Sequence, residues 1–227
     1  MLLWLVDYSD RSTERMLESW ELERLASEYW SIFVIFYISF IWLTKIELLL
    51  YIRILCSIVT GFGANLLAYD VFESDVVKNL GGKYVSKEEM YKTCDVIFLM
   101  MPLLPATKHT INAEMLPLLK KGVLIINTSR GGLIDSTALI SGIQSGIIGG
   151  AGIDVYENEG DYFFQDWSAK NIDDPTLVSL LGNNKVVMTA HQAFFTREAI
   201  EKIVSTTILN IQEFSEGLRG KDLTNSV

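Results

Sequence analysis

The sequence predicts an α/β fold built on a doubly wound parallel sheet, and three observations support this prediction. From Gly61 onward, short apolar runs alternate regularly with stretches of helical character. The apolar runs read as strands buried on both faces, as in a parallel sheet covered by helices. Apolar residues make up 49% of the 227-residue chain and charged residues 21%, a globular balance that permits a sizeable core.

The part of the chain before Gly61 lacks this regular alternation of strands and helices. In Met1–Glu28, apolar residues recur at rough helical spacing, so we expect one amphipathic helix. Tyr29–Leu43 is almost entirely apolar, but it is shorter than the ~20 residues that a bilayer requires. Its aromatic and β-branched content favours a strand buried on both faces, with a membrane span as the alternative. Leu48–Thr60 predicts a buried helix that ends at Gly61.

After Gly61 the strands and helices follow one another in order. The predicted strands are Ala64–Tyr69, Lys83–Val85, Asp95–Met101, Val123–Asn127, Gly149–Tyr156 and Val186–Thr189. The predicted helices are Ser74–Leu80, Lys87–Lys92, Asn112–Leu119, Asp135–Ser145 and Thr196–Gly217. Ser86 with Glu89 three residues later predicts a capped start for the second of these helices.

Charge and cysteine content exclude several classes of function. The net charge of −9 and the pI of about 4.8 argue against a nucleic-acid partner. Cys56 and Cys94 have no metal-binding or redox spacing, so no metal site is predicted. We interpret them as free thiols in a reducing compartment and therefore expect a cytoplasmic protein.

Parallel sheets of this kind bind ligands at the carboxyl ends of their strands. The residues at or just past those ends are Asp70, Met101, Pro102, Thr128, Ser129, Arg130, Asp154 and His191. An acidic residue such as Asp70, at the end of the second strand of a dinucleotide fold, bonds the adenosine ribose and favours NAD over NADP. In isolation, Asp70 could equally be a turn residue.

Two further residue types suit chemistry on a small organic acid. The planar guanidinium of Arg130, followed by Gly131 and Gly132, suits a carboxylate held by two parallel hydrogen bonds. His191 can exchange a proton near neutral pH, and Glu159 would orient its ring and favour its charged form. His109, the other histidine, lies in a polar turn, where we expect it to be solvated. Taken alone, Arg130 could form a surface ion pair and His191 could be structural.

Together these residues lie in stretches that resemble one family, the D-isomer-specific 2-hydroxyacid dehydrogenases. The matching stretches are GFGANLLAYD, CDVIFLMMPLLPATKHTIN, LLKKGVLIINTSRGGLIDSTALI, GGAGIDVYENE and TAHQAFFTREA. The YENE, FFQDWS and HQAFFT segments are similar to the D-lactate dehydrogenases in particular. The match runs from Arg53 to Val227.

The resemblance implies a Rossmann-like NAD-binding domain and a role for each matched residue. Arg130 would bind the substrate carboxylate, His191 would be the acid/base for the ketone oxygen, and Glu159 would tune that histidine. The remaining matches imply NAD as cofactor, with contacts from Asp70, Met101, Pro102, Thr107, Thr128, Ser129, Arg130 and Asp154. The expected reaction is the reduction of pyruvate or a similar 2-keto acid to the D-hydroxy acid.

The resemblance fails before Arg53. The family's phosphate-binding Gly-x-Gly-x-x-Gly turn would fall at Glu47, Leu49 and Ile52, and the chain has no glycine before Gly61. We therefore expect weak or absent turnover. The expected source of residues 1–52 is a truncation, mis-splicing, frameshift or faulty gene model, with a divergent N-terminal segment that has a new role as the alternative.

The expected organisation has three parts. Residues 1–52 form an atypical apolar segment, residues 53–193 the NAD-binding domain, and residues 194–227 a C-terminal helix that in the family packs on the substrate domain. The expected partner is a small 2-keto or 2-hydroxy acid, with neither nucleic acid nor membrane. The family forms homodimers, but the part that includes its dimer helices has no match here. The alternative function is a non-catalytic NAD-binding interaction protein of the corepressor type.

Overall fold

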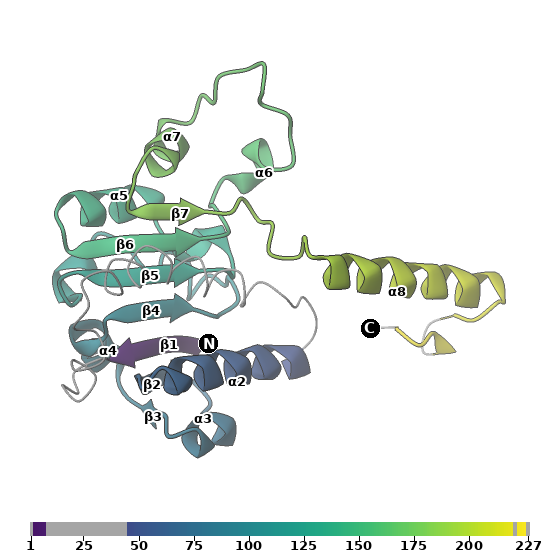
Figure 1. Ribbon diagram of the computed structural model, residues 1–227, viewed down its shortest axis with the longest axis horizontal. Helices are drawn as coiled ribbons and strands as arrows, with labels where there is room; N and C mark the ends of the chain where they lie inside the picture. The colour runs from purple at the N-terminus through teal and green to yellow at the C-terminus, as the bar shows by residue number, and fades with distance from the viewer. Residues whose placement is uncertain (1, 8–44, 220–221, 226–227) are drawn as a thin grey trace.

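The computed structural model describes residues 2–7, 45–219 and 222–225 of the chain. A seven-stranded sheet lies at its centre, in the order β3-β2-β1-β4-β5-β6-β7 (Figure 1). The strands are β1 (Leu2–Asp7), β2 (Asn65–Asp70), β3 (Lys83–Tyr84), β4 (Val96–Leu99), β5 (Val123–Asn127), β6 (Ile148–Ile153) and β7 (Val186–Met188). The helices are α2 (Lys45–Gly61), α3 (Asp75–Asn79), α4 (Lys87–Thr93), η2 (Leu116–Leu118), η3 (Gly131–Leu133), α5 (Ser136–Gln144), α6 (Glu159–Tyr162), α7 (Pro175–Leu181) and α8 (Arg197–Ser215).

The pairing confirms the α/β fold with a mainly parallel sheet. β2 pairs with β3 in parallel, and β4, β5, β6 and β7 form a continuous parallel set. Helices connect successive parallel strands, which the geometry of parallel pairing requires. The carboxyl ends of β4 to β7 consequently lie along one edge of the sheet, where the arrowheads point in Figure 1.

β1 departs from the prediction. It lies between β2 and β4 and is antiparallel to both, with Leu5 opposite Leu67 on one side and Ile97 on the other. The amphipathic helix expected within Met1–Glu28 thus does not include residues 2–7, and the residues on which that expectation was based, 16–25, lie outside the described residues. A strand here pairs the backbone groups of β2 and β4 that face each other, which a helix could not do. Residues 8–28 and the expected strand at 29–43 lie outside the described residues.

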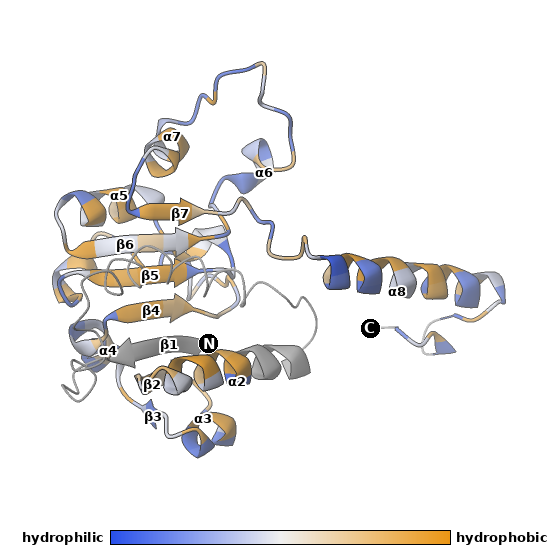
Figure 2. Cartoon of the chain, in the orientation of Figure 1, coloured by the Kyte–Doolittle hydropathy of each residue, from blue (hydrophilic) through white to orange (hydrophobic). Residues whose placement is uncertain are grey.

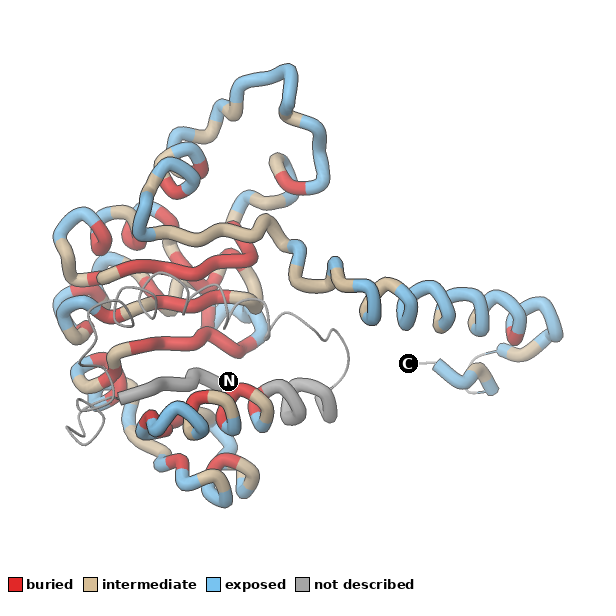
Figure 3. The backbone as a smooth tube through the Cα atoms, viewed as in Figure 1, coloured by how far each residue is buried: buried red, intermediate tan, exposed pale blue. Residues whose placement is uncertain are grey.

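Alternating side chains of β4 divide the core into two clusters, one on each face of the sheet. Figure 3 shows β4 buried along its length. Val96 and Phe98 pack on the face covered by α2 and α3, whereas Ile97 and Leu99 pack on the face covered by α4 and α5. This alternation is the two-residue period of a strand buried on both faces. The doubly wound arrangement follows from it.

α2 confirms the helix expected at residues 48–60 and extends it toward the N-terminus. Its buried residues are Ile52, Leu55, Cys56 and Val59, spaced so that they form one stripe against the sheet. Gly61 ends the helix as expected. Figure 2 shows the apolar character of this part of α2 and of strands β4 and β5.

One predicted helix differs from the structure because of local hydrogen bonding, whereas a predicted helix cap is confirmed. The expected helix Asn112–Leu119 shortens to the single 3-10 turn η2, since Pro117 has no N–H. Before it, the side chain of Asn112 accepts bonds from the amides of Glu114 and Met115 and forms a separate turn. The Ser86 cap is confirmed, because its hydroxyl accepts a bond from the amide of Glu89 at 3.2 Å.

α8 extends away from the sheet and is exposed along most of its length (Figures 1 and 3). Its exposed apolar side chains include Ile203, Val204, Ile208, Ile211 and Phe214. Within the described ranges, no helix is both long and apolar enough to cross a membrane.

Candidate active site

The sequence-predicted residues gather at the carboxyl edge of the sheet. Asp70 ends β2, Met101 and Pro102 follow β4, and Thr128–Arg130 follow β5. Asp154 follows β6, and His191 comes shortly after β7. The other two residues lie in the segments that follow these strands in the sequence, Thr107 after β4 and Glu159 at the start of α6.

His191 and Glu159 form a hydrogen-bonded pair between the loop after β7 and the first residue of α6. The His191 Nδ1 atom lies 3.0 Å from Glu159 Oε1, and both side chains are about three-quarters buried. The second carboxylate oxygen of Glu159 accepts a bond from the amide of Tyr156 at 3.1 Å. The carboxylate is thus fixed on both oxygens, and it fixes the orientation of the ring.

The backbone that carries His191 is in an unfavourable conformation. Ala190 and His191 have φ values of 53° and 55°, in the left-handed region that residues with a Cβ rarely adopt. Such residues cost of order 1–3 kcal/mol each and persist only where the surroundings hold them. Here the carbonyl of Asp154 accepts a bond from the His191 amide at 2.5 Å.

Asp154 is the buried residue that holds this turn. Its side chain is 1% exposed, and its Oδ1 atom accepts bonds from the Thr189 hydroxyl and from the Gln192 amide. Its Oδ2 atom is also buried but has no hydrogen-bond partner within the described protein. A buried carboxylate oxygen without a donor is costly, so this atom suits an N–H group supplied by a ligand.

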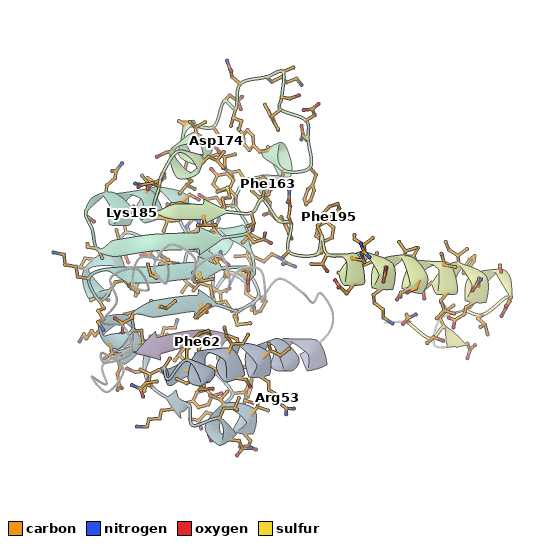
Figure 4. The ribbon with its side chains drawn as sticks, viewed as in Figure 1. Arg53, Phe62, Phe163, Asp174, Lys185 and Phe195 are labelled. Carbon is orange, nitrogen blue, oxygen red and sulfur yellow. The ribbon has the colours of Figure 1, made fainter. Side chains whose placement is uncertain are left out.

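Phe164 packs beside the histidine. Its ring centroid lies 5.9 Å from that of His191, at an interplanar angle of 49°. The residue is 72% exposed and has a φ of 63°, so a bulky side chain is held in a left-handed conformation. The adjacent Phe163 is buried, and Figure 4 shows it close to α6 and β7. The aromatic pair therefore turns one ring into the core and leaves the other at the histidine.

Arg130 lies in a tight turn between β5 and η3. Asn127 shapes this turn from its fully buried position: its amide group donates to the Arg130 carbonyl at 2.9 Å and accepts from the Ser129 amide at 3.1 Å. The Ser129 hydroxyl donates to the Leu99 carbonyl and ties the turn to β4. The guanidinium itself donates to the Ser129 carbonyl at 2.7 Å. Sequence reasoning missed Asn127, although its place at the end of a strand was a usable signal.

The loop after β4 is organised by Thr107. This residue is 1% exposed; its hydroxyl donates to the Pro102 carbonyl at 2.7 Å and accepts from the Leu104 amide at 2.8 Å. Met101 is buried beneath the loop, while Pro102 is exposed. Thr107 therefore fixes the course of the chain at the edge of the sheet.

At the end of β2, the site consists of Asp70 and the neighbouring part of α2. Asp70 is partly exposed, and its Oδ1 atom accepts a bond from the Phe72 amide at 3.3 Å. Nearby, positions 47, 49 and 52 all lie within the continuous helix α2, and Ile52 is fully buried against the sheet. At the positions where the family resemblance predicts a glycine turn, the structure thus has a continuous helix.

His109 is the other correction to the sequence reasoning. It is only partly solvated and has a partner that was not expected: its Nε2 atom lies 3.1 Å from Glu157 Oε2, and its side chain is 35% exposed. The pairing could not be read from spacing, since the two residues are 48 positions apart. In the part of the chain that the structure describes, no group of three or more His, Cys, Asp or Glu residues could hold a metal ion.

Comparison with known proteins identifies the family to which this nucleotide-binding fold belongs. Residues 53–193 match the family model described as the NAD binding domain of D-isomer specific 2-hydroxyacid dehydrogenases. The chain belongs to this family. NAD is accordingly the cofactor of the matched domain.

Individual relatives give the same result. The chain is 46% identical over 154 residues to 2-hydroxyacid dehydrogenase homolog 2 of Schizosaccharomyces pombe, covering 68% of this chain and 46% of that one. It is 42% identical over 175 residues to a putative D-lactate dehydrogenase of Dictyostelium discoideum, covering 76% and 52%. The solved pyruvate reductase of Chlamydomonas reinhardtii is similar with a TM-score of 0.69 and 41% identity, covering 75% and 52%. The chain spans about half the length of the curated relatives it matches.

Proposed function

We propose that this chain acts as an NAD-dependent oxidoreductase that interconverts a 2-keto acid and a D-2-hydroxy acid, with pyruvate and D-lactate as the first pair to test. The observation that carries the proposal is the hydrogen-bonded pair of His191 and Glu159 at the carboxyl edge of the sheet. Reduction of a ketone requires a positioned proton donor, and a histidine oriented by a carboxylate is suited to that role. The cytosol remains the proposed location.

The nitrogen of His191 that transfers the proton can be assigned from the hydrogen bond that the other ring nitrogen makes. Because Glu159 lies at Nδ1 of His191, we assign proton transfer to Nε2. In the reduction, NADH supplies the hydride to the keto carbon when it is bound. His191 gives its Nε2 proton to the keto oxygen, so that the substrate becomes a hydroxy acid and the ring becomes neutral. In the oxidation, the same atom takes the proton back.

Substrate and cofactor contacts are assigned to the other edge residues. Arg130 would bind the substrate carboxylate with its guanidinium fork. At the nicotinamide end, the unpartnered Oδ2 of Asp154 suits the carboxamide N–H group of NAD. Asp70 would bond the adenosine ribose. The remaining proposed cofactor contacts are Met101, Pro102, Thr107, Thr128 and Ser129.

We further propose that turnover is weak. A glycine turn at the start of the first helix lets backbone N–H groups approach the pyrophosphate. Here α2 continues through positions 47, 49 and 52, and Ile52 is part of the core. The nicotinamide end of the site fits the cofactor, whereas the described residues provide no such turn for the phosphates. Weak binding of NAD would then limit the rate.

The alternative is a non-catalytic NAD-binding interaction protein of the corepressor type, for which the matched NAD binding domain of residues 53–193 would be sufficient. Calorimetry with NADH, combined with an absorbance assay for NADH oxidation in the presence of pyruvate, separates the two functions. The enzyme proposal expects binding and slow oxidation, and it expects His191→Ala to lower the rate by about 10²–10⁴-fold without loss of NADH binding. Binding with no oxidation would favour the alternative, and a rate that His191→Ala leaves unchanged would refute the assignment of the histidine.

A further inference from the structure

A second histidine–carboxylate pair lies beside the candidate site. His109 Nε2 is 3.1 Å from Glu157 Oε2, and the side chains are 35% and 23% exposed. His109 has a φ of 49°, so its backbone is held in the left-handed region. The mechanism proposed above uses neither residue, yet they join the loop after β4 to the segment after β6.

The second oxygen of Glu157 extends this connection to a third segment. Glu157 Oε1 accepts a bond at 3.2 Å from the amide of Ser136, the first residue of α5. Ser136 is 4% exposed, so this bond is largely shielded from water. One carboxylate thus joins the loops that follow three neighbouring strands, β4, β5 and β6.

Backbone contacts tighten the same junction around Arg130. The His109 amide donates to the Gly132 carbonyl at 2.8 Å, and the Ile111 amide donates to the Leu133 carbonyl at 3.1 Å. On the other side, Gly131 lies directly against the backbone of Tyr156 and Glu157. The turn that carries Arg130 is therefore enclosed between the loop of His109 and the segment of Glu157.

The segment of Glu157 also carries Glu159. The Tyr156 amide donates to Glu159 Oε2, while Glu159 Oε1 bonds His191. Any shift of residues 156–157 would therefore move both the support of the Arg130 turn and the partner of His191. This geometry distinguishes Glu157 from an ordinary surface ion pair.

We propose that Glu157 and His109 are positioning residues that set the Arg130 turn relative to the Glu159–His191 pair. Neither touches the substrate. Their effect is that Arg130, which would bind the carboxylate, and His191, which would protonate the keto oxygen, can contact the same 2-keto acid at the same time. The inference rests on the proposed function, because it assigns those two roles to Arg130 and His191.

The kinetic test compares Glu157→Ala and His109→Ala with the conservative Glu157→Gln. Gln can accept from the Ser136 amide and donate to a neutral His109 ring, so it should restore most of the activity. The matched control is Asp95→Asn, which breaks the 2.7 Å Lys120–Asp95 ion pair at the opposite edge of the sheet. Positioning errors of about 1 Å can cost on the order of 10²-fold.

For the two Ala variants we expect KM for pyruvate to rise by about 10- to 100-fold, with NADH affinity and the unfolding midpoint close to wild type. Glu157→Gln and Asp95→Asn should retain a KM near that of the wild type. If KM, NADH affinity and the unfolding midpoint all change in parallel, the pair is only structural. If none of them changes, the proposal is wrong.

A second measurement remains decisive if the wild-type chain has no turnover. His109 and His191 are the only histidines of the sequence, so the substitution of one assigns the ring-nitrogen NMR signals of both. We expect Glu157→Ala to shift the signals of His191, although the two side chains share no hydrogen bond, and Asp95→Asn to leave them in place. Unmoved His191 signals in Glu157→Ala would overturn the inference. Shifted signals in a chain that does not turn over pyruvate would uphold the positioning and refute the proposed function instead.

Discussion

Gly131 is a position at which one added methyl group should disrupt the candidate site. A Cβ placed on Gly131 would lie 2.0 Å from the carbonyl carbon of Tyr156 and 2.4 Å from the amide nitrogen of Glu157. Both atoms belong to backbone, which cannot rotate away. We therefore expect Gly131→Ala to force apart the turn of Arg130 and the segment that carries Glu159.

The size of the effect follows from these distances. Carbon atoms without a bond between them ordinarily approach to about 3.5–4.0 Å, so the methyl group would overlap Tyr156 by roughly 1.5 Å. Overpacking of this kind typically costs about 1–3 kcal/mol, and occasionally more. A separation of the two segments by about 1 Å would lower kcat/KM on the order of 10²-fold. In a domain of this size, about 2–3 kcal/mol corresponds to a fall in Tm of roughly 4–12 °C.

Gly132→Ala is the matched control. Its Cβ would meet only the tip of Leu103, at 2.9 Å, and that side chain is 42% exposed and can move aside. Differential scanning calorimetry and the NADH absorbance assay should therefore separate the two variants, with Gly132→Ala close to wild type. Equal behaviour of Gly131→Ala and Gly132→Ala would refute the close backbone packing and the positioning argument built on it.

Three further predictions concern the rest of the fold. Burial raises the pKa of Asp174, but the Tyr156 hydroxyl and the amides that it caps lower it more, so the net pKa lies below its ordinary value. The free energy of unfolding, measured by urea titration, should then fall as the pH drops below about 4, and it should fall less steeply in Tyr156→Phe. The same dependence on pH in both proteins would contradict the role of the hydrogen bond between Tyr156 and Asp174. Burial raises the pKa of the Cys56 thiol to about 12, so at pH 8 a thiol reagent should label Cys56 only in the unfolded protein. Rapid labelling of Cys56 in the folded protein would contradict its burial. Ile211 on α8 is 64% exposed, so Ile211→Ser should change the free energy of unfolding by less than about 0.5 kcal/mol, whereas Leu133→Ala in the core should lower it by about 2–5 kcal/mol. Similar values for both variants would contradict the burial pattern.

The parallel sheet could be predicted because its strands are buried on both faces. Runs such as Val123–Ile126 are continuously apolar, and short helices with polar caps separate them, so the sequence alone indicates the strands and their approximate order. The location of the site followed from the same reasoning, since residues past the ends of parallel strands share one edge. His191 and Glu159 were expected to pair, and their side chains are in contact.

Features that depend on tertiary contacts could not be predicted. The antiparallel course of Leu2–Asp7 depends on the gap between β2 and β4, which no local pattern reveals. The pairing of His109 with Glu157 joins loops distant in the sequence, and the polar surroundings of His109 suggested solvent instead. The shortening of the helix expected at 112–119 depends both on Pro117, which was visible in the sequence, and on the turn formed by Asn112, which was not expected.

The product formed from pyruvate and stoichiometric NADH tests the central claim most directly. Wild-type chain and His191→Ala would be incubated at protein concentrations high enough to detect slow conversion, and the two enantiomers of lactate would be quantified separately. The proposal that His191 transfers the proton in a D-specific reduction predicts slow formation of D-lactate by the wild type. It predicts a rate about 10²–10⁴-fold lower for His191→Ala, even though the variant still binds NADH. Formation of L-lactate, or D-lactate at the same rate from both proteins, would contradict it.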